Sequence, residues 1–338
     1  MTEQRAPTRI KNIAELARLA GVSTGTVSRA LANKSLVNKE TRERIQALAR
    51  EHGFRPNQMA RRLRTQRTGV IGIVVPLGHE LRQHLSDPFF MTILGHLADG
   101  LTENGYDIML SRVIPNDEEW LERIVDSGML DGVLLIGQSN QSEAIERVAA
   151  WYRPMVVWGR HAPGQVHCTV GVDNRAGGRL AGEALIARGA RNLAFIGEIA
   201  APEFADRYLG LCDAAEQAGL TRPVQYEVHV ASDIMAEEIA AHVEALGRHD
   251  GIAAASDLIA MHTVRALADI GRRVPEDTVV TGFDDLPLAE QTIPRLTTIS
   301  QSVGAGAKAM IEALFARISG SDAPSIEMQP VLVQRDTA

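Results

Sequence analysis

The residues Val22-Ser-Thr-Gly-Thr-Val-Ser-Arg-Ala-Leu-Ala32 decide how this chain is organised, because they have the pattern of a short two-faced helix. The apolar residues Val27, Ala30 and Leu31 recur at helical spacing and form its inward face. The outward face carries hydroxyl groups and one arginine, Arg29. A helix that presents such groups at its N-terminal end fits the major groove of DNA, where arginine pairs bidentately with guanine.

A second helix is predicted just before this one, and a third follows it. The segment Ile13-Ala-Glu-Leu-Ala-Arg-Leu-Ala20 has one apolar face, and Gly21 suits the left-handed residue that ends a helix. The third helix is predicted from Lys39 to about His52. Each of the three helices has a capping residue in front of it, namely Asn12, Ser23 and Asn38. The pattern predicts a helix-turn-helix, and on spacing alone an ordinary αα-hairpin is the alternative.

Charge is distributed unevenly along the 338 residues, whose net charge is −7. Residues 1–68 contain 15 basic and 5 acidic side chains, whereas the remainder contains 20 basic and 37 acidic ones. The basic part is therefore the one expected to meet a polyanion, and it coincides with the predicted helix-turn-helix. The length allows two or three domains.

After residue 68, buried strands alternate with helices, which predicts an α/β body of two doubly wound parallel-sheet subdomains. The strands are expected at 69–75, 106–111, 132–136, 155–158, 169–172, 193–196, 226–230, 252–255, 279–283, 296–299 and 331–334. The helices are expected at 89–104, 118–126, 143–151, 175–188, 203–218, 234–246, 258–270 and 303–318. Ligands of such sheets bind beyond the carboxyl ends of the strands, which here means a cleft between two lobes.

Polar and aromatic residues gather at those strand ends. The candidates for ligand contact are Phe89, Phe90, Asp173, Arg207, Asp257 and Asp284. Carboxylates and an arginine exchange hydrogen bonds with hydroxyl groups, and aromatic rings cover the apolar face of a pyranose, so the set favours a polyhydroxylated ligand. Taken singly, an aspartate after a strand is as often a helix cap, and this alternative applies to Asp173 and Asp257.

The basic segment Arg55-Pro-Asn-Gln-Met-Ala-Arg-Arg-Leu-Arg64 completes a resemblance. Residues 13–64 are similar to the headpiece and hinge helix of the lactose/purine repressor family, and the rest of the chain continues to match that family. The resemblance implies DNA contacts at Thr24, Gly25, Thr26, Ser28, Arg29, Asn57, Ala60 and Leu63. Among them, Arg29 and Thr24 would read bases, and Leu63 would insert into the minor groove. Gly25 departs from many relatives, which carry a side chain there, so direct readout at that position should be weak.

The same resemblance implies a domain plan and a mode of action. A headpiece is expected at 8–55, a hinge helix and linker at 56–68, and a periplasmic-binding-protein-like body at 69–338. The body's first lobe would comprise about 69–160 and 291–321, and its second lobe about 161–290 and 322–338. The family's effector-contacting positions include those of Arg207, Asp257 and Asp284. A homodimer, joined through residues 69–159, would bind palindromic double-stranded operator DNA as a repressor under the control of a small effector.

Other function classes fit the sequence less well. A nucleotide-dependent α/β enzyme is disfavoured because neither Gly-x-Gly-x-x-Gly nor Gly-x-x-x-x-Gly-Lys-Ser/Thr occurs. A transport binding protein would share the body but would have an export signal in place of a basic headpiece. No cofactor, metal or membrane span is expected, and the location should be cytoplasmic. For the effector, a sugar or sugar phosphate is favoured over a purine, and inducer and corepressor action both remain open.

Overall fold

The computed structural model describes residues 10, 12–31, 33, 36–54, 67–77, 83–138, 140–230 and 234–338. The chain divides into two compact units, residues 1–68 and residues 69–338, which are described separately. In the described part of the chain, no helix combines the length and the apolar character needed to cross a membrane.

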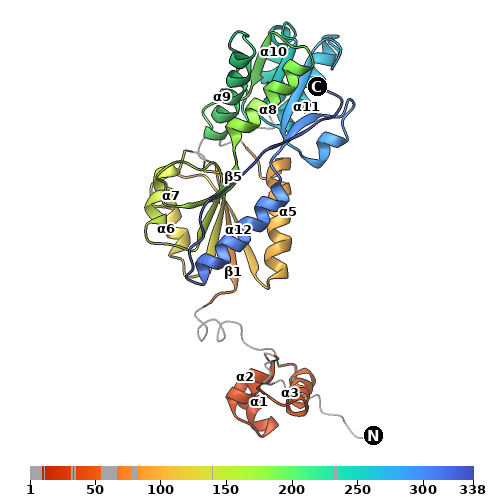
Figure 1. Ribbon diagram of the computed structural model, residues 1–338. Coiled ribbons are helices and arrows are strands. Elements are labelled where there is room, and N and C mark those ends of the chain that lie inside the picture. The colour runs from red at the N-terminus through yellow and green to blue at the C-terminus, as the bar shows by residue number, and fades with distance from the viewer. Residues whose placement is uncertain are drawn as a thin grey trace, which may run out of the picture. The chain divides into compact units, whose positions relative to one another are not determined.

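The described residues of the first unit form three helices (Figure 1). Its helices are α1 (Ile13–Ala20), α2 (Thr24–Leu31) and α3 (Lys39–Glu51). Their apolar faces meet in a small core that contains Leu16, Val27, Ala30, Ile45 and Ala49.

Local hydrogen bonds explain where the three helices begin. The side-chain oxygens of Asn12, Ser23 and Asn38 accept backbone N–H groups at 2.9, 3.1 and 2.8 Å, which satisfies donors that the first turn leaves unpaired. Gly21 ends α1 with a φ of +63°, a conformation that glycine adopts without strain. The predicted helices and caps are therefore confirmed. The expected hinge helix, with Asn57, Ala60 and Leu63, lies outside the described residues.

The second unit contains two six-stranded sheets, each the centre of one lobe. The first lobe has the strand order β11-β5-β4-β3-β1-β2, and all its pairings are parallel. Its strands are β1 (Val70–Pro76), β2 (Asp107–Val113), β3 (Gly132–Ile136), β4 (Met155–Trp158), β5 (Cys168–Val172) and β11 (Ile326–Met328). Helices α5 (Pro88–Glu103) and α12 (Val303–Ile318) cover one face, and α6 (Trp120–Val125) and α7 (Ser142–Ala149) cover the other (Figure 1).

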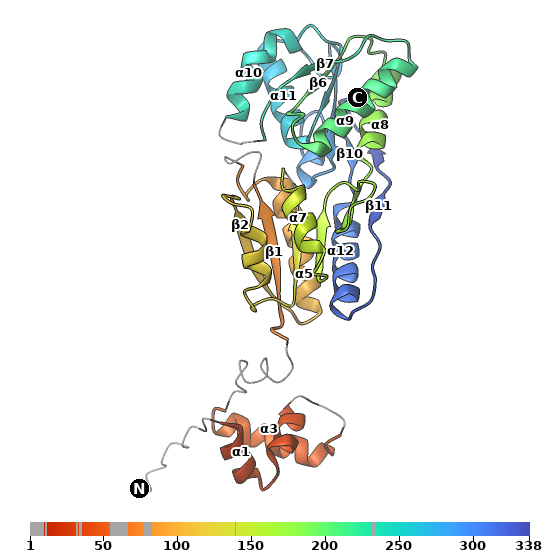
Figure 2. The ribbon, with the colours of Figure 1, turned by 90° about the vertical axis from the view of Figure 1, so that its left-hand side faces the viewer.

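The second lobe has the strand order β12-β10-β9-β8-β6-β7, and only the β10–β12 pairing is antiparallel. Its strands are β6 (Leu193–Ile196), β7 (Val224–Tyr226), β8 (Gly251–Ala254), β9 (Val279–Asp284), β10 (Thr297–Ser300) and β12 (Val331–Val333). Its helices are α8 (Asn174–Ala187), α9 (Pro202–Gln217), α10 (Met235–Leu246), α11 (Asp257–Asp269) and the short 3-10 helix η1 (Pro287–Glu290). Helices α8 and α9 pack together on one side of the sheet, and α10 and α11 pack together on the other (Figure 2).

The lobe boundaries expected at 160/161, 290/291 and 321/322 are wrong. The chain leaves the first lobe after β5, returns to it between β10 and α12, and leaves it again between β11 and β12. Strand β5 pairs with β4 and β11, so it belongs to the first lobe and not to the second. Buried parallel strands have similar apolar sequences, so the sequence pattern alone does not reveal which sheet a strand joins.

The strand expected at 226–230 is also misplaced. Strand β7 ends at Tyr226, where its register with β6 ends. Val228 and Val230 are still buried in the core, but they lie in a loop, and the backbone N–H of His229 donates to the Glu238 carboxylate at 2.8 Å. Burial of alternate residues produced a strand-like pattern there without strand pairing. Strand β11 and helix η1 were not predicted.

Candidate effector site and DNA-binding helix

A cavity lies between the two lobes of the second unit and has about 900 Å³ of empty space, part of it open to solvent. The first lobe contributes the aromatic side chains of Phe89, Phe90 and Trp158 and the polar side chains of Gln83, Asp87 and Gln138. The second lobe contributes Asn174, Glu203, Arg207, Ser256 and Asp284, and Gln301 follows strand β10.

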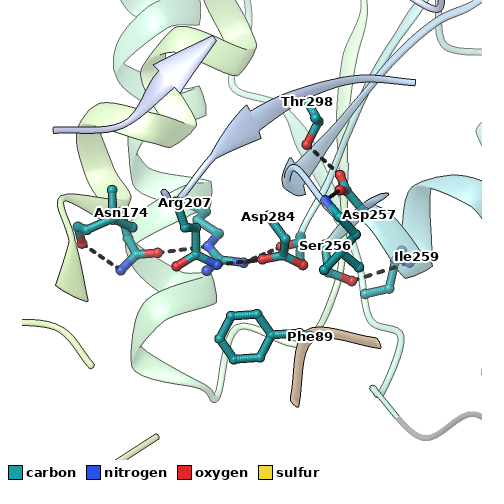
Figure 3. A network of polar contacts seen from close by, with 12 residues as sticks. Phe89, Asn174, Arg207, Ser256, Asp257, Ile259, Asp284 and Thr298 are labelled. Atoms are coloured by element: carbon teal, nitrogen blue, oxygen red, sulfur yellow. Dashed lines mark hydrogen bonds and ion pairs between the residues drawn. The ribbon is translucent and has the colours of Figure 1, made fainter. Parts of the chain in front are cut away.

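Arg207 is the central polar side chain of the cavity (Figure 3). It projects from α9 and is only 5% exposed. Its Nε donates to Oδ1 of Asn174 at 2.9 Å, and its Nη1 donates to the carbonyl oxygen of Ala255 at 2.5 Å. The guanidinium carbon lies 3.7 Å from the centroid of the Phe283 ring, so the charged group is stacked as well as hydrogen-bonded. These contacts hold the guanidinium in one orientation.

Asp284 faces Arg207 from the end of β9 (Figure 3). Its Oδ1 lies 3.8 Å from Nη1 of Arg207 and accepts a hydrogen bond from Nε2 of Gln301 at 2.5 Å. Burial raises the pKa of Asp284 to about 7, although Arg207 and Gln301 act in the opposite direction. Its φ of +124° lies in the region that favours glycine, and strained residues of this kind often mark functional sites.

The close approach of α8 and α9 explains why Arg207 reaches Asn174. A Cβ built on Gly178 of α8 would lie 2.0 Å from the carbonyl oxygen of Arg207. A Cβ built on Gly210 of α9 would lie 2.0 Å from the carbonyl oxygen of Arg175. The two helices therefore cross backbone to backbone, which only glycine permits at these positions. The crossing places the start of α8 beside the Arg207 side chain.

Gly210→Ala should force α8 and α9 apart, destabilise the protein by about 1–3 kcal/mol and weaken effector binding. Gly95→Ala is the matched control, because Gly95 also lies within a helix but has no atom within 4 Å of its Cβ position. The control should raise stability by about 0.5–1 kcal/mol, since alanine is the better helix former. Denaturant unfolding of both variants measures the difference, and equal stabilities would contradict the role of the crossing.

On the first-lobe side, Asp87 and two phenylalanines begin helix α5. The Asp87 carboxylate caps the helix by accepting the backbone N–H of Phe89 at 2.9 Å, and Nε2 of Gln83 donates to it at 3.3 Å. Burial raises the pKa of Asp87. The Phe89 ring lies 6.2 Å from that of Trp158 and below the Arg207–Asp284 pair in Figure 3. An aromatic wall therefore faces the polar groups of the second lobe.

The structure brings together four of the six predicted contact residues: Phe89, Phe90, Arg207 and Asp284 all line the cavity. Asp173 does not line it, and its carboxylate caps α8 by accepting the backbone N–H of Ala176 at 2.9 Å. Asp257 is fully buried behind Asp284, where it accepts the N–H of Leu286 at 2.8 Å and the hydroxyl of Thr298 at 2.5 Å. These two carboxylates are therefore structural, as the helix-cap alternative suggested for Asp173.

Several lining residues were missed: Gln83, Asp87, Gln138, Asn174, Glu203, Ser256 and Gln301. Asn174 could have been found, because it lies two residues after the end of β5. Gln138 and Gln301 carry a similar signal, because they lie two residues and one residue after the ends of β3 and β10. Gln83 and Glu203 carry no such signal, since only the fold brings them to the cavity.

On helix α2, Thr24 and Arg29 are exposed, whereas Gly25, Thr26 and Ser28 are partly buried. A Cβ built on Gly25 would lie 3.7 Å from both terminal nitrogens of Arg29, so the guanidinium extends back over Gly25 toward the helix N-terminus. The hydroxyl oxygen of Thr26 lies 2.9 Å from that of Ser23. The arginine is thus placed on the outward face, as the sequence predicted.

Stability should depend on pH through Asp284. The ordinary pKa of the carboxyl is 3.8 and its folded-state value is about 7, so the folded protein binds this proton more tightly than the unfolded chain does. The resulting stabilisation is complete below pH 3.8 and is lost as the pH rises through 7. Between about pH 5 and pH 8 the wild type should therefore lose more stability than Asp284→Asn does. Chemical denaturation at both pH values tests this, and parallel losses would contradict it.

Comparison with known proteins agrees with both units. Residues 12–57 match the bacterial regulatory proteins of the lacI family, and residues 183–338 match the periplasmic binding protein-like domain. The HTH-type transcriptional regulator RegA of Clostridium saccharobutylicum is 31% identical, and the match covers 96% of this chain and 98% of that protein. The HTH-type transcriptional regulator CelR of Thermobifida fusca is also 31% identical, with 97% and 96% covered.

Solved structures show the same relationship. A transcriptional regulator CelR–cellobiose complex superposes with a TM-score of 0.69 at 26% identity, covering 97% of this chain and all of that one. The lac repressor dimer bound to operator and the anti-inducer ONPF gives a TM-score of 0.82 at 21% identity, which shows a shared fold. With its helix-turn-helix unit, its two-lobed body and a near full-length match to RegA, the chain belongs to the lacI family of bacterial regulatory proteins and is a DNA-binding transcriptional regulator, not an enzyme.

Proposed function

We propose that this protein represses transcription from a palindromic operator and that a carbohydrate bound between the two lobes controls its affinity for DNA. The observation that carries the proposal is the cavity in which Arg207, Asp284 and Asn174 face the rings of Phe89 and Trp158. Oriented charged groups opposite aromatic rings suit a ligand with hydroxyl groups around an apolar ring face.

The names of related proteins support this ligand class. One structural neighbour is a complex with cellobiose, and one relative, from Halalkalibacterium halodurans, is a ribose operon repressor. Each of these names describes that protein, and the proposal for this chain rests on its own cavity.

For DNA recognition, Arg29 and Thr24 read base edges, while Thr26, Ser28 and other headpiece residues contact phosphates. Gly25 leaves the N-terminal turn of α2 open for the guanidinium of Arg29. Residues 8–55 form the headpiece and residues 56–68 the hinge. In that hinge, Asn57, Ala60 and Leu63 contact the operator, and Leu63 inserts between base steps. Because the operator lies on the chromosome, the protein acts in the cytoplasm.

The operator-binding form is a homodimer, because one helix-turn-helix reads only half of a palindrome. The first lobe carries suitable surface for the dimer contact. Met91 on α5 and Leu110 on the edge strand β2 are 55% and 48% exposed, and Ile114, which follows β2, is 44% exposed. Exposed apolar side chains on neighbouring elements are typical of a protein–protein interface.

The effector controls DNA binding through the arrangement of the two lobes, which three segments of the chain join. A ligand that contacts both lobes stabilises one arrangement of them, and the ligand shifts the equilibrium by its difference in affinity for the two arrangements. In a dimer, that shift changes the spacing of the two hinge segments and so the fit to the operator.

The test is an operator titration with the full-length protein, in the presence and absence of each member of a carbohydrate panel that includes cellobiose and ribose. At least one sugar should change the operator dissociation constant by tenfold or more, within the usual range of about 5–150-fold for coupled sites. If the operator affinity responds to no carbohydrate, the proposal is wrong.

A further inference from the structure

The described residues of the cavity wall include carboxyl groups from both lobes. Asp87 comes from the first lobe, and Glu203 and Asp284 come from the second. The charge of Asp87 helps to raise the pKa of Asp284, so the two carboxylates interact electrostatically across the cleft. A ligand between the lobes therefore meets carboxyl groups on two sides.

Arg207 is the cation among the described lining residues, and its charge is already compensated. Its donors reach Asn174 and the carbonyl oxygen of Ala255, and Asp284 lies 3.8 Å away. Arg160 pairs with Asp206 at 3.1 Å and is not among the residues that line the wall. The remaining described polar side chains of the wall are amides and one hydroxyl, from Gln83, Gln138, Asn174, Ser256 and Gln301.

We propose that the effector is an uncharged polyhydroxyl compound, and that Asp87 and Asp284 accept hydrogen bonds from its hydroxyl groups and exclude phosphorylated or carboxylated sugars. This inference rests on the proposed function, and it adds a charge requirement to it. Above about pH 7, the Asp284 carboxyl is mostly ionised. An ionised carboxylate only accepts hydrogen bonds, and so does a phosphate dianion, so the two cannot pair. Like charges brought together at a binding site repel one another, whereas a hydroxyl donates to either carboxylate.

The experiment is calorimetric titration of the full-length protein with matched pairs of ligands at about pH 8, where the Asp284 carboxyl, with a pKa of about 7, is mostly ionised. Each neutral mono- or disaccharide in the panel is paired with its phosphate ester or its sugar acid, for example glucose with glucose 6-phosphate and ribose with ribose 5-phosphate. The pair that includes the best-bound neutral sugar should show the charged member binding at least about 100-fold more weakly.

Two variants test whether the carboxylates cause this discrimination. Asp87→Asn and Asp284→Asn should each weaken neutral-sugar binding and reduce the neutral-to-charged affinity ratio by at least about tenfold, because each removes a negative charge from the wall. Asp213→Asn is the control, because this α9 carboxylate pairs with Arg175 at 2.7 Å and is not among the lining residues. The neutral-to-charged affinity ratio of Asp213→Asn should equal that of the wild type. General damage to the lobe would weaken both ligands equally and leave the ratio unchanged.

Tight binding of a phosphate ester or sugar acid would overturn the inference and leave the proposed function in place. A ratio that stays the same in both asparagine variants would overturn the role of the two carboxylates. If no carbohydrate of either charge binds, the proposed function itself is wrong and this inference falls with it. If a variant fails to fold, the neutral-to-charged affinity ratio of the wild type still decides whether the effector must be uncharged.

Discussion

Asp284→Asn should abolish the response of operator binding to the effector while leaving operator binding without effector intact. The side chain keeps its size, but it loses the negative charge opposite Arg207 and one oxygen acceptor in the cavity. Charge-assisted hydrogen bonds are each worth about 1.5–3 kcal/mol, so effector affinity should fall at least tenfold. The headpiece is a separate compact unit and is not altered. Calorimetry with the effector and operator titrations with and without it measure both effects.

The resulting phenotype distinguishes the two modes of control. The variant should repress permanently if the ligand is an inducer and should be permanently inactive if the ligand is a corepressor. Arg207→Ala should behave in the same way with a larger loss of stability, because it leaves the buried Asp284 without its counter-charge.

Asp173→Asn is the control for this experiment. Asparagine caps helices about as well as aspartate does, and Asp173 is not among the residues that line the cavity. This variant should respond to the effector as the wild type does. The effector site lies elsewhere if operator binding by Asp284→Asn responds at the effector concentration that suffices for the wild type. The same holds if Asp173→Asn loses the response.

The second large effect is expected in the headpiece. Arg29→Ala should cost roughly 1–3 kcal/mol of specific operator affinity and relax the base preference at one position of each half-site. The guanidinium is exposed on the outward face of α2, whereas Val27 and Ala30 on the opposite face hold the helix in the core. Removal of the guanidinium should therefore not unfold the domain. Competition binding with operators substituted at each position measures the change in preference.

Arg50→Ala is the matched control, because Arg50 is also exposed in the headpiece but lies in the last turn of α3. It should affect all DNA sequences alike, through its charge, and the effect should shrink as salt is added. A uniform loss for Arg29→Ala as well would identify Arg29 as a phosphate contact and contradict the assignment of base reading.

Local sequence determined the helix-turn-helix. Capping interactions join residues that are close in sequence, so the local sequence pattern is enough to predict them. They are found here at Asn12, Ser23 and Asn38, with the helix stop at Gly21. The alternation of buried strands and helices in the body was likewise visible, because strand and helix periodicities are local properties. Within the effector site, Asp284 could be predicted because it stands at the end of a strand of the body. Arg207 lies inside helix α9, and it was singled out by the resemblance to the family.

Tertiary structure decided which sheet each strand joins and which polar residues meet. Strand β5 joins the first lobe through its pairing with β4 and β11. The chain therefore crosses between the lobes after Val172 and not at the expected boundary of 160/161. Asp173 and Asp257 look like Asp284 in sequence, but one caps α8 and the other is buried against Leu286 and Thr298. These outcomes depend on contacts between segments that are far apart in the chain, and such contacts leave no local pattern. The energy of a buried carboxylate is set by the groups that surround it. The folded arrangement therefore decides that Asp284 lines the cavity, whereas Asp173 and Asp257 bond to groups of the protein.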